Sequence, residues 1–382
     1  MTRPLKKNID LICFSHLRWN FVYQRPQHLM NRFAKEQRVF FVEEPIYDAP
    51  SQFNEIYEDP VSKICIVTPH LTSTNEDANE ALRHLLNIFM AEMIITDFIA
   101  WYYTPMALAF CDHLDPELTV YDCTNDLSSF KSIAPTLQEW EERLFKKADI
   151  VFTAGAYLYE VKKDQHENIH PFPGGIDIDH FKQARDLIKE PDDQLAIPRP
   201  RIGFFGVIDE RFNIDLLEAV AEKQTDWHFV MVGPTERIDP VILPKEPNIH
   251  FTGIKDYKEL PAYLAGWNVA MIPFQLNETT KYISPTKTPE FLAAGTPVVS
   301  TSIHDIVYPY GEKKFVRIAD TPDEFVCAIE ELLKFEKMEW IKEVDTFLAT
   351  RSWDDIWKQM KEIMDRTLEK KSINRNKSKI YA

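Results

Sequence analysis

Segments with the apolar pattern of strands alternate with segments of helical periodicity along nearly the whole chain. In the first half, residues 9–15, 38–42 and 149–153 are short apolar runs, and residues 137–147 have a helical pattern. The alternation stops at residues 184–200, which carry charges and three prolines, and then resumes. Strands that alternate with helices of this length predict βαβ units and mostly parallel sheets, so we expect two consecutive α/β domains.

The composition argues against several common classes of protein. The chain has 382 residues, 45% of them apolar, which is enough for two packed cores. Only 10 glycines occur, and neither a G-x-G-x-x-G nor a G-x-x-x-x-G-K-[ST] pattern is present, which argues against a dinucleotide fingerprint and a P-loop. The formal charge of −16 disfavours a nucleic-acid partner, because phosphate backbones repel an acidic chain.

The cysteines and the apolar segments indicate a cytoplasmic protein. The 5 cysteines are widely spaced and form no C-x-x-C pair, so we expect reduced thiols. The apolar run at 9–14 is too short for a signal peptide, and the most apolar stretch, 85–110, contains Glu92 and Asp97. The tail at 371–382 is basic and has no acid, which favours a flexible, solubilising end. The alternative is weak attraction to the anionic inner face of the cell membrane.

The strongest functional signal lies in residues 277–301, which read N-E-T-T-K-Y-I-S-P-T-K-T-P-E-F-L-A-A-G-T-P-V-V-S-T. The predicted strand at 269–272 leads into this polar loop, and we expect a helix to begin at Thr288 and Pro289, with Thr288 as its N-cap. Gly295 suits the end of that helix, because left-handed backbone geometry is cheapest for glycine. The helix would thus begin at the carboxyl end of a parallel strand, where open α/β sheets bind ligands.

Two charged residues near this helix start suit two parts of one ligand. Lys287 offers a mobile positive charge to a phosphate, and the N–H groups of a helix start also favour an anion. Glu290 would repel a diphosphate that it faced, so its better role is to accept hydrogen bonds from vicinal hydroxyls such as those of a ribose. Phosphate and sugar recognition side by side predict a nucleotide-sugar site. The alternative is that Lys287 is an ordinary surface residue and Glu290 an ordinary helix-start acid.

A second cation follows the predicted strand at 201–205. Arg211 lies in the loop at the carboxyl end of that strand, and its planar guanidinium suits phosphate oxygens. Gly206, at the start of the loop, would let the backbone approach the phosphates. The alternative for Arg211 is a surface ion pair with Asp209 or Asp215.

The first domain offers polar and aromatic side chains at its own strand ends. Side chains able to stack on a sugar or donate hydrogen bonds to it follow the first strand: His16, Arg18, Trp19, Gln24 and Arg25. After the strand at 118–121, Asp126 is our first candidate for a general base, and Asp122 is the second. Ordinary loop packing of His16 and Trp19, and turn capping by the two aspartates, are the alternatives.

These motifs together resemble the GT-B glycosyltransferases, most closely the bacterial enzymes grouped with family 4. The donor-binding signature of that family is similar to S-P-T-K-T-P-E-F-L-A-A-G-T-P-V-V at 284–299, and three further motifs agree with it: F-G-V-I-D-E-R at 205–211, G-G-I-D at 174–177 and Q-R-P-Q-H-L at 24–29. The resemblance implies an α/β fold with two Rossmann-like domains whose mostly parallel sheets face each other across a cleft. It also implies that the second domain holds the donor nucleotide and that a C-terminal helix crosses back to the first domain. The first domain would hold the acceptor, so the candidates after its first strand would bind the acceptor, and Asp126 or Asp122 would deprotonate the acceptor hydroxyl.

The resemblance and the pattern together give domain limits and a set of donor contacts. We expect the acceptor domain at 1–190, completed by a returning helix at 352–370, the donor domain at 198–350, and a basic flexible tail at 371–382. We expect the donor nucleotide and its phosphates to contact side chains or backbone of the second domain: Gly206, Arg211, Tyr282, Ser284, Thr286, Lys287, Thr288 and Glu290.

One position departs from the family pattern. Family 4 enzymes usually carry a second glutamate eight positions before the one that matches Glu290, and this chain has Tyr282 there. The nearest acid is Glu278, which we expect at the donor sugar. The spacing of the lysine is also similar to inverting GT-B glucuronosyltransferases, so retention and inversion both stay open. No metal-ligand pattern is present, and Lys287 and Arg211 can neutralise a leaving diphosphate, so we expect no metal and no other cofactor.

These features predict a hexosyltransferase that uses a nucleoside-diphosphate sugar, with a UDP-sugar favoured. The expected acceptor is a saccharide or lipid-linked saccharide in the synthesis of a cell-surface polysaccharide or glycoconjugate. One alternative is a nucleotide-sugar 2-epimerase on the same fold, which would need a UDP-specific site and several acid/base groups around a sugar carbon. Another is a catalytically degenerate subunit that binds the nucleotide-sugar for a partner, an idea motivated by Tyr282.

Overall fold

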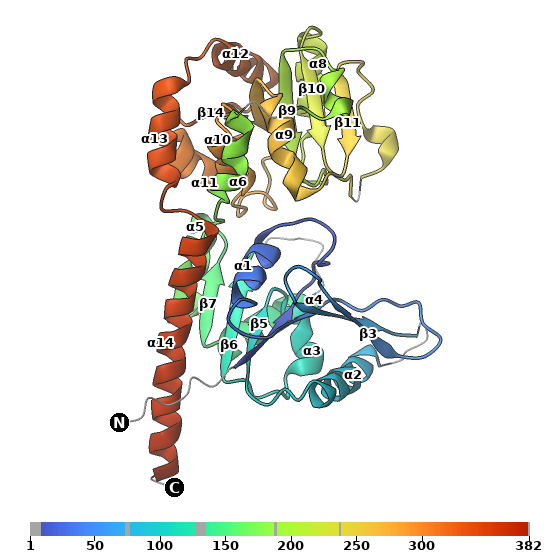
Figure 1. The fold of residues 1–382 in the computed structure, drawn as a ribbon, viewed down its shortest axis with the longest axis vertical. Coiled ribbons are helices and arrows are strands. Elements are labelled where there is room, and N and C mark those ends of the chain that lie inside the picture. Colours follow the sequence, from blue (N-terminus) through green and yellow to red (C-terminus); the bar gives the residue numbers. More distant parts are fainter. Residues whose placement is uncertain (1–8, 73–76, 127–134, 187–188, 237, 381–382) are drawn as a thin grey trace. The chain divides into compact units, whose positions relative to one another are not determined.

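The computed structural model describes residues 9–72, 77–126, 135–186, 189–236 and 238–380, and the chain folds into two α/β units (Figure 1). The first unit comprises the residues up to Ala154, then Leu158–Phe172, and the residues from Ile356 onward. The second unit comprises Gly155–Tyr157 and Pro173–Asp355. The prediction of two α/β domains with mostly parallel sheets is confirmed.

The first unit contains an eight-stranded sheet in the order β3-β4-β2-β1-β5-β6-β7-β8, parallel throughout except where β3 pairs with β4. Its strands are β1 (Asp10–Phe14), β2 (Val39–Val42), β3 (Phe53–Glu58), β4 (Cys65–His70), β5 (Phe98–Tyr102), β6 (Leu118–Cys123), β7 (Ile150–Thr153) and β8 (Ile169–Pro171). Its helices include α1 (Arg25–Phe33), α2 (Ala78–Glu92), α3 (Leu108–Cys111), α4 (Pro135–Lys147) and most of α5 (Ala156–Lys162). The central strands β1, β2, β5 and β6 are buried along their whole length, which explains their nearly continuous apolar sequences.

The second unit contains a six-stranded, fully parallel sheet in the order β11-β10-β9-β12-β13-β14. Its strands are β9 (Arg201–Phe205), β10 (His228–Val232), β11 (Ile249–Gly253), β12 (Val269–Ile272), β13 (Val298–Ser300) and β14 (Val316–Ile318). Its helices include α6 (Ile178–Lys182), α7 (Asp192–Leu195), α8 (Ile214–Lys223), α9 (Leu260–Ala265), α10 (Lys287–Ala293), α11 (His304–Ile306), α12 (Pro322–Leu333) and α13 (Met338–Leu348). The neighbouring strands β9 and β12 therefore present their carboxyl ends together.

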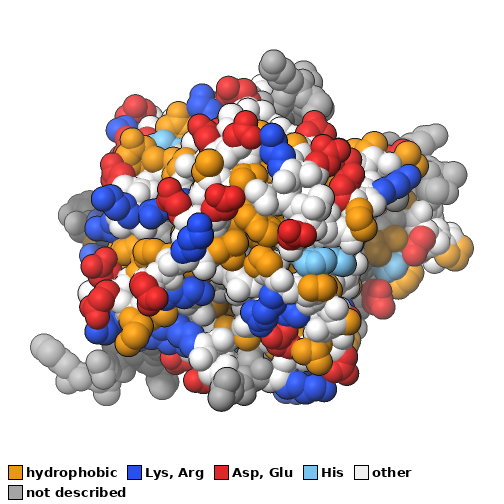
Figure 2. Space-filling view, turned by 90° about the horizontal axis from the view of Figure 1, so that it is seen from above, with side chains coloured by type: hydrophobic (Ala, Val, Ile, Leu, Met, Phe, Trp, Pro, Cys, Tyr) orange, Lys and Arg blue, Asp and Glu red, His pale blue; other side chains and the backbone are white. Residues whose placement is uncertain are grey.

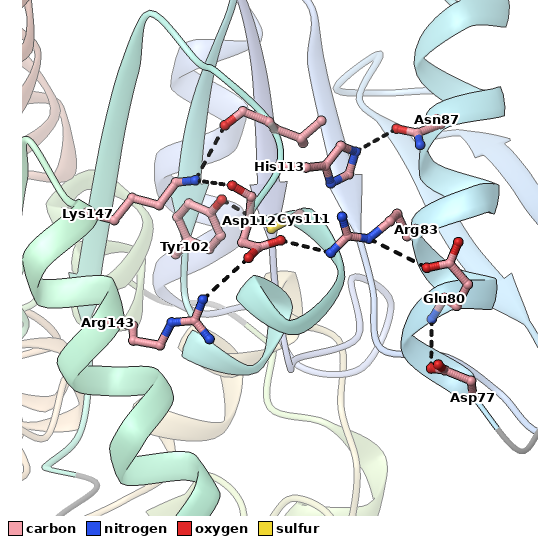
Figure 3. A network of polar contacts seen from close by, with 11 residues as sticks. Asp77, Glu80, Arg83, Asn87, Tyr102, Cys111, Asp112, His113, Arg143 and Lys147 are labelled. Carbon is pink, nitrogen blue, oxygen red and sulfur yellow. Dashed lines mark hydrogen bonds and ion pairs between the residues drawn. The ribbon is translucent and has the colours of Figure 1, made fainter.

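A polar network centred on Asp112, which follows α3, joins helices α2 and α4 of the first unit (Figure 3). The Asp112 carboxylate accepts hydrogen bonds from Arg83 of α2 at 2.9 Å and from Arg143 of α4 at 3.4 Å. The backbone oxygen of Asp112 accepts a hydrogen bond from Lys147 Nζ at 2.6 Å. Because these side chains are partly exposed, each ion pair contributes at most about 1 kcal/mol. The network fixes the direction of α2 and α4 rather than supplying much stability.

Charges of both signs are mixed on one face of the molecule. Figure 2 shows one face of the molecule, on which acidic and basic side chains are interspersed with apolar ones between them. Such mixing keeps the local potential low although the whole chain carries a formal charge of −16.

The last helix differs in length from the prediction. Helix α14 (Trp353–Ile380) begins where the sequence indicates, because Ser352 accepts a hydrogen bond from the backbone N–H of Asp355 at 3.1 Å. From Ile356 onward it belongs to the first unit, so the predicted crossing back is confirmed. The expected flexible tail from 371 is instead helical as far as 380, and Lys371 bonds Asp149 at 2.6 Å. Attraction of the tail to a membrane stays a prediction.

The boundary between the units also differs from the prediction. We expected a linker ending the first domain at 190, whereas the residues from Pro173 onward pack within the second unit. Gln194 is fully buried there, since its amide accepts from Trp267 Nε1 at 2.8 Å and donates to the carbonyl of Tyr263 at 3.0 Å. The residues around Gln194 therefore pack within the second unit and do not form a separate linker.

Candidate functional site

Helix α10 starts two residues earlier than the sequence suggested, with Thr286 and not Thr288 at the N-cap position. Thr286 already has helical backbone angles, and the backbone N–H of Thr288 donates to Pro285 O at 3.3 Å. Thr288 is therefore inside the helix and does not cap it, which corrects the prediction. Its buried hydroxyl has no hydrogen-bond partner among the described residues. Gly295 follows the helix with φ of +73°, as the sequence predicted.

Lys287 and Glu290 lie side by side on the first turn of α10. Lys287 Nζ is 3.2 Å from Glu290 Oε2 and 4.8 Å from the centroid of the Phe205 ring, at the end of β9. The Glu290 side chain is only 5% exposed, and Lys287 is 18% exposed. Burial raises the pKa of the Glu290 carboxyl, and the ammonium of Lys287 offsets part of that rise. The pair therefore holds a buried acceptor directly beside a partly accessible cation.

Two glycines bring the strand ends close to this pair. Gly206, directly after β9, has φ of +146°, and a Cβ on it would lie 3.5 Å from Lys287 Cε. Gly233, after β10, has φ of +138°, and a Cβ there would lie 2.0 Å from the carbonyl oxygen of Gly206. Only glycine fits such a close approach, so the backbone at the end of β9 lies close to the Lys287 side chain.

Arg211 lies in the loop that leaves β9, but it is paired within that loop. Its Nε lies 2.8 Å from Asp209 Oδ1, and its Nη2 also bonds the Asp209 carboxylate. Its backbone oxygen accepts from Gln275 N at 2.7 Å, which ties the loop to the chain after β12. Among the described residues, no contact joins Arg211 to Lys287 or Glu290.

Residues that precede residue 178 contact the loop before α10, although the sequence placed them in the first domain. The Tyr282 ring stacks on Tyr157 with centroids 5.5 Å apart. A Cβ on Gly155 would meet Ser284 Cβ at 3.2 Å, and a Cβ on Gly174 would meet Thr286 Cγ2 at 2.4 Å. The motif at 174–177 gave a partial signal for this contact, but nothing in the sequence pointed to Gly155 or Tyr157. Glu278 is exposed, and its Oε2 lies 3.7 Å from Lys281 Nζ.

In the first unit, the loop after β1 is organised by Glu43, which the sequence analysis missed. Glu43 accepts from the Trp19 backbone N–H at 2.7 Å, from Arg18 Nη1 at 2.9 Å and from Thr68 Oγ1 at 2.9 Å. Trp19 is buried and its ring packs against the Phe41 ring, which agrees with the alternative of ordinary loop packing. Arg18 is partly exposed and His16 half-buried at the end of β1.

The remaining first-domain candidates lie mostly in buried pairs. Arg25 bonds both carboxylate oxygens of Asp122, and both side chains are buried, so Arg25 presents no exposed donor to an acceptor and Asp122 has no exposed oxygen. Asp126 is also buried and lies 2.7 Å from Lys162 Nζ. Gln24 precedes α1, where it takes part in a capping box with Gln27. Burial therefore corrects the roles predicted for Arg25 and Asp122.

Two general features bear on cofactors and membranes. Across the described ranges, no cluster of three or more His, Cys, Asp or Glu side chains could hold a metal ion. In the same part of the chain, no helix has both the length and the apolar character that crossing a bilayer requires.

Comparisons with known proteins agree on one family and one fold. Residues 199–334 match the family described as glycosyl transferases group 1. The chain is 27% identical over 288 residues to a Bacillus subtilis (strain 168) protein provisionally named teichuronic acid biosynthesis glycosyltransferase TuaH, covering 68% of this chain and 70% of that protein.

Solved structures match over nearly the full length. Sucrose-phosphate synthase from Thermosynechococcus elongatus superposes with a TM-score of 0.69 at 14% identity, covering 94% of this chain and 98% of that one. Anabaena HepE, solved with UDP and glucose, gives a TM-score of 0.65 at 13% identity, covering 93% and 99%. At such low identity these matches show the fold alone, and that fold is GT-B.

Proposed function

Because this chain is a group 1 glycosyltransferase with the GT-B fold, we propose that it transfers a hexosyl group from a UDP-sugar to a saccharide or lipid-linked acceptor. The proposed process is the synthesis of a cell-surface polysaccharide. The similarity to a protein named for teichuronic acid biosynthesis supports that process, and the UDP in the HepE structure supports the choice of nucleotide.

The observation that carries the proposal is the pairing of Lys287 with buried Glu290 beside Gly206. A nucleoside diphosphate offers each of them a better partner. Lys287 would leave Glu290 and bind a phosphate oxygen, while the ionised Glu290 would accept hydrogen bonds from both ribose hydroxyls. The absence of a side chain on Gly206 would let the diphosphate approach the backbone at the end of β9.

The same groups support a reaction without a metal ion. Breaking the bond between the sugar and the diphosphate places additional negative charge on the leaving phosphate. Lys287 and Arg211 would stabilise that charge, and because Asp209 already holds Arg211, the Arg211 side chain needs little reorganisation. Independence from metal is therefore part of the proposal.

For the acceptor, we assign binding to the loop after β1, where Arg18 and His16 are accessible. If the reaction inverts the anomeric configuration, it needs a base, and Asp126 stays our candidate. Asp126 ends the described part of the chain before residue 127, and Lys162 holds its carboxylate. Glu278 would contact the donor sugar, and Tyr282 the donor nucleotide or its phosphates, from the loop before α10.

A titration with nucleotides tests the donor half of this proposal. Calorimetry with UDP, GDP, dTDP and CMP should show the tightest binding for UDP. Lys287→Ala should weaken UDP by at least about tenfold, the effect of losing one charge-assisted contact, while uridine binding changes little. Glu290→Gln should weaken UDP and uridine equally. Equal binding of UDP by the Lys287→Ala variant and the wild type would remove this site from the mechanism.

A further inference from the structure

In the loop between β9 and α8, both carboxylate oxygens of Asp209 accept hydrogen bonds from Arg211. Asp209 is 9% exposed, and its Oδ1 accepts from the backbone N–H of Arg211 at 3.0 Å and from Arg211 Nε at 2.8 Å. Its Oδ2 accepts from Arg211 Nε at 3.0 Å and also from Nη2. One nearly buried carboxylate thus fixes both the backbone and the side chain of Arg211.

The pairing with Asp209 leaves the other edge of the Arg211 guanidinium available to bind a ligand. Asp209 approaches from the side that carries Nε and Nη2. The opposite edge consists of Nη1 and the second hydrogen of Nη2, and among the described residues no acceptor bonds Nη1. The Arg211 side chain is 36% exposed. A guanidinium that is held on one edge can offer the other edge to two phosphate oxygens at once.

The backbone around Arg211 is also fixed. Gln275 N donates to Arg211 O at 2.7 Å, and Phe212 N donates to Asp209 O at 2.9 Å. The Phe212 ring packs edge-on against Phe204 of β9 with centroids 5.0 Å apart. The arginine therefore has a rigid base, and only its side chain needs a partner to hold it in place.

We propose that Asp209 is a positioning residue that holds the guanidinium of Arg211 toward the pyrophosphate of the donor. The inference rests on the proposed function, since it assumes that a nucleoside diphosphate binds at the ends of β9 and α10. Asp209 itself does not touch the ligand. Its negative charge opposes an anion, but restricting the arginine beforehand removes an ordering cost that a free side chain would incur on binding.

The competing explanation predicts an effect of the opposite sign. If Asp209 only neutralised Arg211, its removal would free a positive charge and tighten UDP binding. If Asp209 positions Arg211, its removal weakens UDP binding. The neighbouring Glu210 is exposed and has the same charge, so Glu210→Gln reproduces the change in net charge without touching the pair.

Calorimetric titrations of the full chain with UDP and with uridine test the proposal. Asp209→Asn should weaken UDP by about tenfold, leave uridine unchanged, and have no further effect in an Arg211→Ala background. Glu210→Gln should bind UDP within about twofold of the wild type. Unchanged uridine binding also shows that each variant is folded.

A second variant guards against a fold defect in Asp209→Asn. Arg211→Lys keeps the positive charge but loses the two parallel N–H donors of the guanidinium. It should therefore lose about as much UDP affinity as Asp209→Asn. The proposal is overturned if Asp209→Asn binds UDP as tightly as the wild type or more tightly, if it weakens UDP in the Arg211→Ala background, or if Arg211→Lys binds normally. A wild-type protein that binds neither UDP nor uridine would instead overturn the proposed function.

Discussion

Arg25 and Asp122 form a buried, two-pronged ion pair across the first unit. Arg25 Nε lies 2.9 Å from Asp122 Oδ2, and Nη2 lies 2.9 Å from Oδ1. A third donor, Nη1, bonds the carbonyl oxygen of Phe172 at 2.8 Å. The pair links the start of α1 to the end of β6, two segments 97 residues apart in the chain. Its function is therefore structural, although both residues follow strand ends where catalytic groups are often found.

Removing the acid from this pair should destabilise the first unit strongly. Asp122→Ala leaves a buried guanidinium without its counter-charge, which costs about 3–5 kcal/mol. Urea unfolding followed by circular dichroism measures that loss. The matched control is Asp112→Ala, which removes a partly exposed carboxylate from Arg83 and Arg143 and should cost under about 1 kcal/mol. Equal losses in the two variants would contradict the assignment.

The raised pKa of Glu290 makes nucleoside binding sensitive to pH. Burial raises the pKa of this carboxyl, and only its ionised form accepts hydrogen bonds from both ribose hydroxyls. Uridine affinity should therefore fall as pH decreases from 7 through the raised pKa of Glu290, about pH 5 being a practical lower limit. Calorimetry at several pH values measures this. Glu290→Gln should make the affinity low and independent of pH, and a wild-type affinity that depends on pH no more than that of Glu290→Gln would contradict the prediction.

The stability of the second unit should follow the opposite trend at this site. A carboxyl whose pKa is higher in the folded than in the unfolded protein binds its proton more tightly when folded. Its contribution is therefore most favourable below the ordinary pKa, near 4.5, and is lost as pH rises through the folded pKa. Wild-type protein should lose more stability over that window than Glu290→Gln, as measured by urea unfolding at each pH.

Local signals in the sequence predicted local structure well. Thr321 and Glu324 form a capping box at the start of α12, and Ser352 caps α14. Such caps depend on residues three apart, so the sequence contains all the partners. The strand segments are equally local, since continuous apolar runs are what buried parallel strands require.

Features that depend on distant partners were not predictable in the same way. The segment around Gln194 has the composition of a linker, and only its contacts with Tyr263 and Trp267 show that it is packed. Asp122 and Asp126 both follow a buried strand, and nothing near them in the sequence reveals Arg25 or Lys162 as their partners. An aspartate at a strand end is compatible with catalysis and with a buried ion pair, and for Asp122 the contact with Arg25 decides for the ion pair.

Gly233 should tolerate no side chain. A Cβ at this position would lie 2.0 Å from Gly206 O, and φ of +138° is strained for other residues. Gly233→Ala should cost about 3 kcal/mol or more, because either the backbone after β10 or that after β9 must move. The control is Gly253→Ala, where φ is +72° and nothing lies within 4 Å, so only the backbone strain of about 1–2 kcal/mol applies. Unfolding by urea compares them, and similar losses would contradict the steric argument.

His70 in the edge hairpin should titrate above its ordinary range. The hydrogen bond from Nδ1 to Asp48 at 2.6 Å raises the pKa of His70, burial lowers it, and Glu55 at 3.2 Å from Nε2 raises it further. The resulting stabilisation is fully present below the unfolded pKa of about 6.5 and is lost as pH rises through the folded pKa. An NMR titration of the His70 ring measures the shift, which Asp48→Asn should reduce. His113, whose pKa burial lowers, is the internal control, and a lower pKa for His70 than for His113 would contradict the prediction.

Glu43 should control the order of the loop that carries the proposed acceptor contacts. Its carboxylate accepts from Trp19 N, Arg18 Nη1 and Thr68 Oγ1, all within 2.9 Å. In Glu43→Gln the amide can still accept from Trp19 but places an N–H₂ group against Arg18 or Thr68, so about 1.5–3 kcal/mol of charge-assisted bonding is lost. Hydrogen exchange at the Trp19 amide should speed up at least about tenfold. Thr68→Val, which removes one neutral donor, should have a smaller effect, because the charged bond to Arg18 remains. If the Trp19 amide in Glu43→Gln exchanged as slowly as in the wild type, packing against Phe41 alone would hold the loop.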